Sequence, residues 1–196
     1  MKFKYPKRLA KLLQGYTGTW AIAGGWAIDL FLNKETRSHK DIEVFILRAE
    51  QLKFKSYLSD WKFNFVYAGK LIPWADEYLE LPIHEIHGQN EFGEAMEVLL
   101  NEEINGSWQF RRNRHIEYPI NRVIISSVLG IPIVSPEIVL LYKARINQEN
   151  DILDLRTTLP NLDISQVRIL KHWITDTHGN HEWLQEIDKY INHKTG

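Results

Sequence analysis

The sequence predicts a mixed α+β fold in which a β-rich part precedes a helical part. Short apolar and alternating runs, typical of strands, occur before residue 134 and are separated by glycine, proline and asparagine. Beyond Ser135 the spacing of apolar residues predicts four helices, at 137–147, 150–158, 164–176 and 181–192. We expect two parts, 1–134 and 135–196, and no Gly/Ser-rich linker separates them.

Composition excludes several classes of protein. Of the 196 residues, 44% are hydrophobic, which is ample for a buried core. The formal net charge of −1 gives no general attraction to nucleic acid. Without cysteine there are no disulfides and no cysteine zinc sites, and without a long apolar run we expect no membrane span. We expect a cytoplasmic protein.

A glycine pair follows the first apolar run. Residues 19–23 read as a buried strand, Gly24 and Gly25 as a tight turn, and residues 26–32 as a helix. The free N–H groups at the start of such a helix attract phosphate. An ordinary turn between two elements is the alternative interpretation.

Two carboxylates follow on the next predicted strand, at residues 41–47. Asp41 and Glu43 are separated by one residue, so on a strand they point the same way, roughly 6.5–7 Å apart. Phe45 and Leu47 continue their face, which indicates that both faces are covered and that unpaired carboxylates there are costly without a cation. Mg²⁺ prefers such oxygen ligands. A half-exposed strand with a solvated acidic face is the alternative.

Basic residues lie just before this strand. Of Lys34, Arg37, His39 and Lys40, we select Arg37 and His39 as candidates to contact the phosphates of a nucleotide. A second basic cluster ends the predicted strand at 108–114. For that cluster we favour a solvated hairpin end over contact with phosphate or acceptor.

Three segments together resemble a known family. They are Gly-Gly-Trp-Ala-Ile-Asp at 24–29, Thr-Arg-Ser-His-Lys-Asp-Ile-Glu at 36–43 and Pro-Glu-Ile-Val-Leu-Leu-Tyr-Lys-Ala at 136–144. They resemble the antibiotic nucleotidyltransferases of the DNA polymerase β superfamily, and most of all the aminoglycoside and lincosamide nucleotidyltransferase branch.

The resemblance implies a fold and a chemistry. The fold is a small mixed sheet with flanking helices, followed by a helical part. The chemistry is transfer of a nucleoside monophosphate from a nucleoside triphosphate, in first place ATP, to a hydroxyl group, with Mg²⁺ (two ions) and release of pyrophosphate.

The resemblance also assigns residues. Asp41, Glu43 and Glu97 would hold the metal, with Glu97, on the predicted strand 95–101, as the third carboxylate or as general base. Gly24, Gly25, Arg37, His39 and Lys143 would contact the triphosphate. Glu43 and Glu97 depart from the family pattern, in which Asp is commoner at the second position. A salt-bridged Glu97 and a Lys143 that merely extends to solvent are the structural alternatives.

The acceptor is the least defined part. A small molecule with a hydroxyl group is expected, with an aminoglycoside or lincosamide antibiotic as the family's known choice. An acidic stretch would suit a cationic acceptor: Asp76, Glu77, Glu80, Glu85, Glu91 and Glu94. The alternative is an antitoxin-type minimal nucleotidyltransferase that binds or nucleotidylates a partner protein.

Overall fold

The computed structural model describes residues 2–195 and confirms the mixed α+β class. The strands are β1 (Trp20–Ile22), β2 (Glu43–Leu47), β3 (Lys62–Tyr67), β4 (Lys70–Pro73), β5 (Glu85–Gln89), β6 (Ala95–Ile104), β7 (Ser107–Gln109), β8 (Glu117–Pro119), β9 (Ile124–Ser126) and β10 (Pro132–Val134). The α-helices are α1 (Lys4–Leu12), α2 (Gly24–Phe31), α3 (Gln51–Tyr57), α4 (Ile120–Val123), α5 (Pro136–Ala144), α6 (Glu149–Thr158), α7 (Ile164–His178) and α8 (Trp183–Thr195).

One mixed sheet organises the first part of the chain. Its strand order is β4-β3-β5-β6-β2-β1-β10-β9, and β7 pairs with β6 and with β8. Two pairs are parallel, β2 with β6 and β1 with β10, whereas the other pairs are antiparallel. The carboxylate strand β2 therefore lies in the middle of the sheet, with β6 and β1 as its neighbours.

The helix after the glycine pair begins earlier than the sequence suggests. Gly24 is itself the first residue of α2, and its φ of 58° lies in the left-handed region that glycine adopts without strain. Strand β2 begins later than expected, at Glu43, so Asp41 lies in the connection before the strand. Both shifts move the predicted boundaries by two residues, and the order strand, glycine pair, helix, carboxylate strand is confirmed.

Residues 69–82 contain the strand β4. Ala68 and Gly69, both at positive φ, form the turn of an antiparallel β3–β4 hairpin. A second antiparallel hairpin, with Gly130 in its connection, is formed by β9 and β10.

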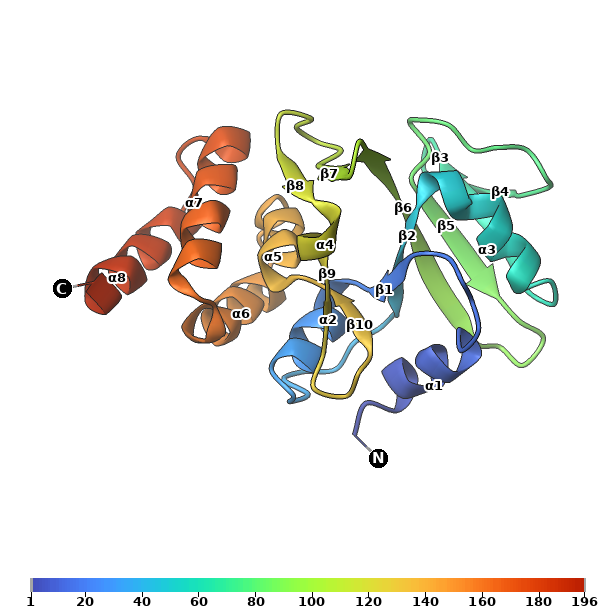
Figure 1. Cartoon of the computed structure of the whole chain (residues 1–196), viewed down its shortest axis with the longest axis horizontal. Coiled ribbons are helices and arrows are strands. Elements are labelled where there is room, and N and C mark those ends of the chain that lie inside the picture. The colour runs from blue at the N-terminus through green and yellow to red at the C-terminus, as the bar shows by residue number, and fades with distance from the viewer. Residues whose placement is uncertain (1, 196) are drawn as a thin grey trace.

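All four predicted C-terminal helices are present, as α5 to α8. Ser135 takes the N-cap position of α5, without a capping hydrogen bond from its side chain, and Pro136 lies in the first turn. Asp163 and Gln166 form a capping box at the start of α7, and Gly179 ends that helix. Helix α5 packs against α2, α6 and α7, so it is the element that joins the helices to the sheet region. Figure 1 shows α7 and α8 at one end of the molecule and β3, β4 and α3 at the other.

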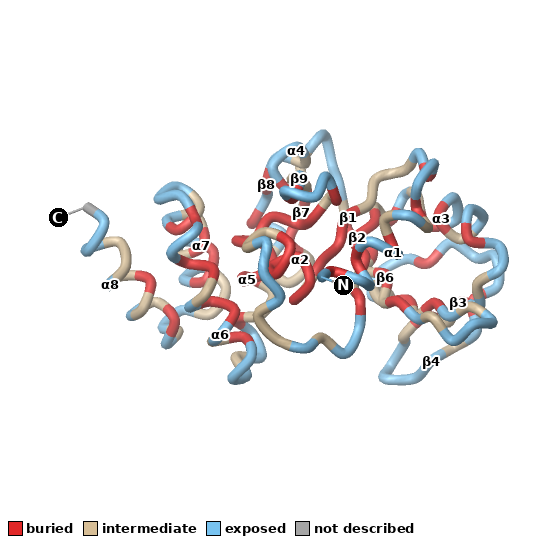
Figure 2. Tube along the Cα trace, turned by 90° about the horizontal axis from the view of Figure 1, so that it is seen from below, coloured by how far each residue is buried: buried red, intermediate tan, exposed pale blue. Residues whose placement is uncertain are grey.

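The core runs through the centre of this elongated arrangement. Buried segments concentrate in β1, β2, α2 and α5, whereas the outer turns and the exposed faces of the outer helices are open to solvent (Figure 2). Val44 and Ile46 of β2 are fully buried and Phe45 nearly so, which confirms that the strand is covered on both faces. Among the described residues, no helix is both long and apolar enough to cross a membrane.

Candidate active site

Glu43 and Glu97 lie side by side at the start of two parallel strands. They are direct partners in the β2–β6 register, so their side chains leave the same face of the sheet. Neither carboxylate has a hydrogen-bond or ion-pair partner within residues 2–195. Burial, followed by the charge of Glu97, raises the pKa of Glu43 to about 7. Burial and the charge of Asp41 likewise raise the pKa of Glu97.

Asp41 stands slightly apart from this pair. Its side chain is 45% exposed, and its nearest cation is Lys40, at 4.0 Å between Nζ and Oδ2. Its charge nevertheless contributes to the raised pKa of both Glu43 and Glu97, so the three carboxylates share one electrostatic neighbourhood. Within the described part of the chain they do not form a ready-made cluster of three metal ligands.

The two glycines let side chains approach the backbone at the start of α2. A Cβ atom at Gly24 would overlap the carboxylate of Glu43, and one at Gly25 would overlap the side chains of His39 and Arg37. A larger residue at either position would therefore displace these side chains, and the positive φ of Gly24 adds to the preference for glycine there. The glycine pair has Glu43 on one side and the predicted phosphate contacts Arg37 and His39 on the other.

A pocket of about 320 Å³ opens over the carboxylate pair, and we call it the central pocket. The sheet contributes Glu43 and Glu97 to its lining, the start of α2 contributes Gly24, and α5 contributes Tyr142 and Lys143. Of the acidic stretch 76–94, Glu85 reaches this pocket. A second pocket of about 820 Å³, between α1 and the segments around His39 and Ala95, is bordered by Asp41. The carboxylates are thus reached from two pockets.

Lys143 lies in the central pocket but is already paired. Its Nζ lies 2.8 Å from Oδ1 of Asp151 and 2.9 Å from Oδ2 of Asp154, both on α6. Its charge lowers the pKa of Glu43, which shows that it is also within electrostatic reach of the carboxylate pair. Burial alone would lower the pKa of Lys143, but its hydrogen bonds and ion pairs with the two aspartates raise it. Lys143 is therefore a charged residue held in place by α6.

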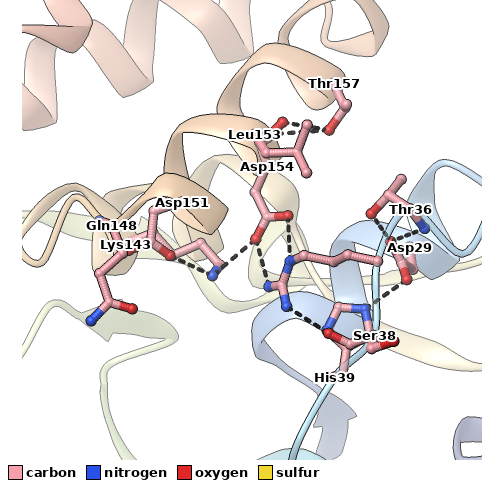
Figure 3. Close-up of polar contacts among 11 residues, drawn as sticks. Asp29, Thr36, Ser38, His39, Lys143, Gln148, Asp151, Leu153, Asp154 and Thr157 are labelled. Atoms are coloured by element: carbon pink, nitrogen blue, oxygen red, sulfur yellow. Dashed lines mark hydrogen bonds and ion pairs between the residues drawn. The ribbon is translucent and has the colours of Figure 1, made fainter.

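Arg37 and His39 are held by carboxylates as well. Arg37 donates from Nε and Nη2 to the two carboxylate oxygens of Asp154, at 3.1 and 2.9 Å. His39 Nε2 lies 2.6 Å from Oδ2 of the fully buried Asp29, and its ring packs on Trp26 with centroids 4.4 Å apart. Figure 3 shows Asp154 between the Lys143 side and the Asp29–His39 side of this network. Neither Arg37 nor His39 lines the central pocket, and their contact with phosphate stays a prediction.

The donor set of the pocket fits a divalent cation. Glu43 and Glu97 are half-buried carboxylates with raised pKa values and no cationic partner, a costly arrangement that an ion bound between them would neutralise. Carboxylate oxygens are the ligands that Mg²⁺ prefers.

Sequence reasoning missed the residues that hold the predicted cations. Asp151 and Asp154 carry no motif and become visible only when α6 packs beside the site. Arg111 and Arg112 belong to the basic cluster that we assigned to a solvated hairpin end, yet both line the central pocket, whereas Arg114 is exposed. Trp108 and Phe110 alternate with a polar residue in the sequence, and both rings are buried in the structure. This alternation was the signal that the strand leading to the arginines packs against the core.

Solved structures with the same fold were found among nucleotidyltransferases. The lincosamide antibiotic adenylyltransferase LnuA, with lincomycin bound, is 19% identical over 80% of this chain and 95% of its own, with a TM-score of 0.57. The antibiotic-resistance factor ANT(2'')-Ia is 13% identical over 98% of this chain and 100% of its own, with a TM-score of 0.59. An antigenic nucleotidyltransferase-like protein from Paracoccidioides brasiliensis is 14% identical over 96% of this chain and 90% of its own, with a TM-score of 0.51.

These similarities define the class and then the family. At such low identity the solved structures establish the fold, and the chain is a nucleotidyltransferase by fold and family. Residues 7–115, more than half of the chain, match the family described as aminoglycoside-2''-adenylyltransferase, and the chain belongs to that family. No curated protein matches the chain by sequence.

Proposed function

We propose that this enzyme transfers a nucleoside monophosphate to a hydroxyl group of a small molecule in a Mg²⁺-dependent reaction. The first candidate for the donor is ATP, which would supply AMP. The observation that carries the proposal is the paired register of Glu43 and Glu97, beside Gly24 and within electrostatic reach of Lys143. This is an acidic site with a neighbouring cation and a phosphate-compatible helix start.

The reaction forms a bond between the acceptor oxygen and the α-phosphorus and breaks the bond from that phosphorus to the bridging oxygen of the β-phosphate. Pyrophosphate leaves, and the hydroxyl proton passes to a base. Glu43 and Asp41 would hold Mg²⁺. Glu97 would either share that role or accept the proton, for which its raised pKa is suited. Bound Mg²⁺ stabilises negative charge on the attacking and leaving oxygens; two ions would act on both at once.

The protein side chains supply position and charge. The backbone N–H groups at Gly24 and Gly25 would face the triphosphate, with Lys143 beside it. Because Asp151 and Asp154 fix the Lys143 ammonium, little conformational entropy is lost when phosphate binds there. Arg37 and His39 would act from behind Gly25, where both side chains lie against the start of α2.

For the acceptor we propose a hydroxyl of an aminoglycoside or lincosamide antibiotic. The family description names aminoglycosides, and among the similar structures LnuA holds lincomycin and ANT(2'')-Ia holds adenylyl-2''-tobramycin. Glu85 adds negative charge to the central pocket, which favours a cationic acceptor at that wall.

The test is a pyrophosphate-release assay with each of the four nucleoside triphosphates and a panel of both antibiotic classes. We expect Mg²⁺-dependent release that Asp41→Asn and Glu43→Gln reduce by at least about a hundredfold. Asp60→Asn, which removes an exposed carboxylate that lines neither pocket, serves as the matched control and should leave the rate unchanged. Full activity of folded Asp41→Asn would contradict the metal assignment.

A further inference from the structure

Two adjacent arginines line the central pocket without an acidic partner. Arg111 and Arg112 follow β7, which pairs with the last residues of β6, whereas Glu97 lies near the beginning of that strand. Within residues 2–195, neither guanidinium forms an ion pair with a carboxylate. The Cζ atoms lie 5.7 and 5.2 Å from the centroid of the Tyr142 ring, so both arginines pack against one aromatic side chain.

Arg112 has an unsatisfied donor in this position. Its Nη1 donates to the backbone oxygen of Tyr142 at 2.9 Å, but its Nε is buried without a hydrogen-bond partner. Burial, then the charges of Arg111 and Arg145, lower the pKa of Arg112 to about 10. A partly desolvated guanidinium next to a second one, with no counterion, is an arrangement that destabilises the protein by itself.

The other cation of the pocket already has carboxylate partners. Lys143 is shared between Asp151 and Asp154, so its charge is partly balanced within the protein, unlike the charges of the two arginines. Glu43, Glu85 and Glu97 are acidic residues that the sheet contributes to the lining. The pocket thus has an acidic side on the sheet and a basic side at Arg111 and Arg112, and the basic side has no counterion.

A purely structural role explains only part of the arrangement of Arg111 and Arg112. The Tyr142 carbonyl belongs to the last turn of α5, where carbonyl groups lack helix partners and a cation is favourable. That contact uses one N–H of Arg112. It does not account for the buried Nε of Arg112. Arg111 interacts with the Tyr142 side chain through a hydrogen bond and the ring contact, but this neutral partner leaves its charge without a counterion.

We propose that Arg111 and Arg112 form a phosphate subsite on the basic side of the central pocket. The planar guanidinium binds phosphate oxygens through parallel N–H groups, and two such groups side by side suit a phosphate monoester or a polyphosphate. The phosphate comes from the triphosphate of the donor or from a phosphorylated acceptor. The assignment to donor or acceptor rests on the proposed function, whereas the subsite itself does not.

The test uses inorganic phosphate as the probe, with the metal removed by EDTA. Thermal unfolding is followed at increasing phosphate for the wild type, the double variant Arg111→Gln/Arg112→Gln and Arg114→Gln, which makes the same change at an exposed position of the same loop. General salt effects of phosphate are shared by the three proteins, so only the differences count. We expect apparent phosphate affinity to fall at least about tenfold in the double variant and to stay within about twofold in Arg114→Gln.

A charge-preserving variant keeps the test decisive if the glutamine double variant does not fold. Arg111→Lys/Arg112→Lys keeps both charges without the planar fork and should bind phosphate with intermediate affinity. If neither double variant differs from Arg114→Gln, or if the wild type binds no phosphate, the subsite is overturned.

Titration of Mg²⁺-ATP then identifies the source of the phosphate. Competition between phosphate and Mg²⁺-ATP assigns the subsite to the donor, and simultaneous binding assigns it to the acceptor. If the wild type binds phosphate through these arginines but binds no triphosphate, the proposed function fails and the subsite stands. If Mg²⁺-ATP binding requires Glu43 while the arginine variants bind phosphate normally, the subsite fails and the proposed function stands.

Discussion

Arg37 Nη2 lies 2.9 Å from Oδ2 of Asp154, an ion pair between residues that are 117 positions apart. Asp154 is fully buried and also binds Lys143, so one carboxylate holds a loop residue before β2 and a residue of α5. Burial alone would raise the pKa of Asp154. The hydrogen bond from Arg37 and the charge of Lys143 outweigh it, and the pKa lies below 3.8. This pairing fixes the helices against the glycine pair and the carboxylate strand.

Asp154→Asn should therefore destabilise the protein by about 3 kcal/mol at neutral pH, because two partly buried cations lose their shared carboxylate. Urea unfolding followed by circular dichroism measures this change. A carboxylate whose pKa is lowered by folding stabilises above its ordinary pKa of 3.8 and loses that effect as pH falls below it. The difference between wild type and variant should accordingly shrink below about pH 4.

Asp188→Asn is the matched control for this experiment. Asp188 pairs with Lys171 on the surface, where both side chains are 40% or more exposed. Such pairs contribute about 0–1 kcal/mol, so the control should unfold nearly like the wild type. Equal effects of the two substitutions would show that the Asp154 pairing carries no special share of the stability.

Gly24→Ala should damage both the fold and nucleotide binding. The φ of 58° at Gly24 is strained for alanine, and the added Cβ would displace the Glu43 carboxylate. Gly69→Ala separates the two effects, because Gly69 has a φ of 74° but open space around it. We expect a loss of about 1 kcal/mol for Gly69→Ala and a clearly larger one for Gly24→Ala, measured by urea unfolding. Equal losses would mean that the contact with Glu43 is not constrained.

The sequence was informative where local pattern decides structure. The glycine pair, the apolar strand after Asp41 and the four C-terminal helices follow from spacing and turn chemistry, and the structure contains all of them. Glu97 was found through a resemblance, and its register with Glu43 agrees with a shared site.

What could not be predicted depends on long-range packing. No local signal indicates that Asp154 will meet Arg37, or that Arg112 turns toward Tyr142 while Arg114 stays outside. The start of α2, which lies at Gly24, was predicted two residues too late for a related reason. A left-handed glycine can belong either to a turn or to the first residue of a helix, and in the structure Gly24, with a φ of 58°, is the first residue of α2.

Glu43→Gln should stabilise the metal-free protein. The Glu43 carboxylate is held near Glu97 without a cation, so a neutral side chain of the same shape removes the repulsion and much of the desolvation cost. At pH 8 in EDTA we expect a gain of about 1–2 kcal/mol in the free energy of unfolding. Asp41→Asn should have a smaller effect, because Asp41 is 45% exposed.

Addition of Mg²⁺ should remove the stability advantage of Glu43→Gln over the wild type. Mg²⁺ should raise the unfolding temperature of the wild type and leave that of Glu43→Gln nearly unchanged, because only the wild type keeps the full set of carboxylates. A wild type that gains nothing from Mg²⁺, together with a Glu43→Gln variant less stable than it in EDTA, would contradict a cation site at this pair.

The most direct test of the central claim is calorimetric titration of ATP into the wild type and into Glu43→Gln, with Mg²⁺ and with EDTA, and with GTP, CTP and UTP as comparators. If the protein is a metal-dependent nucleotidyltransferase, the wild type should bind at least one triphosphate in the presence of Mg²⁺. Removal of the metal by EDTA, or the Glu43→Gln substitution, should weaken this binding by at least about tenfold. Equal binding with and without Mg²⁺, or no binding of any of the four triphosphates, would contradict it.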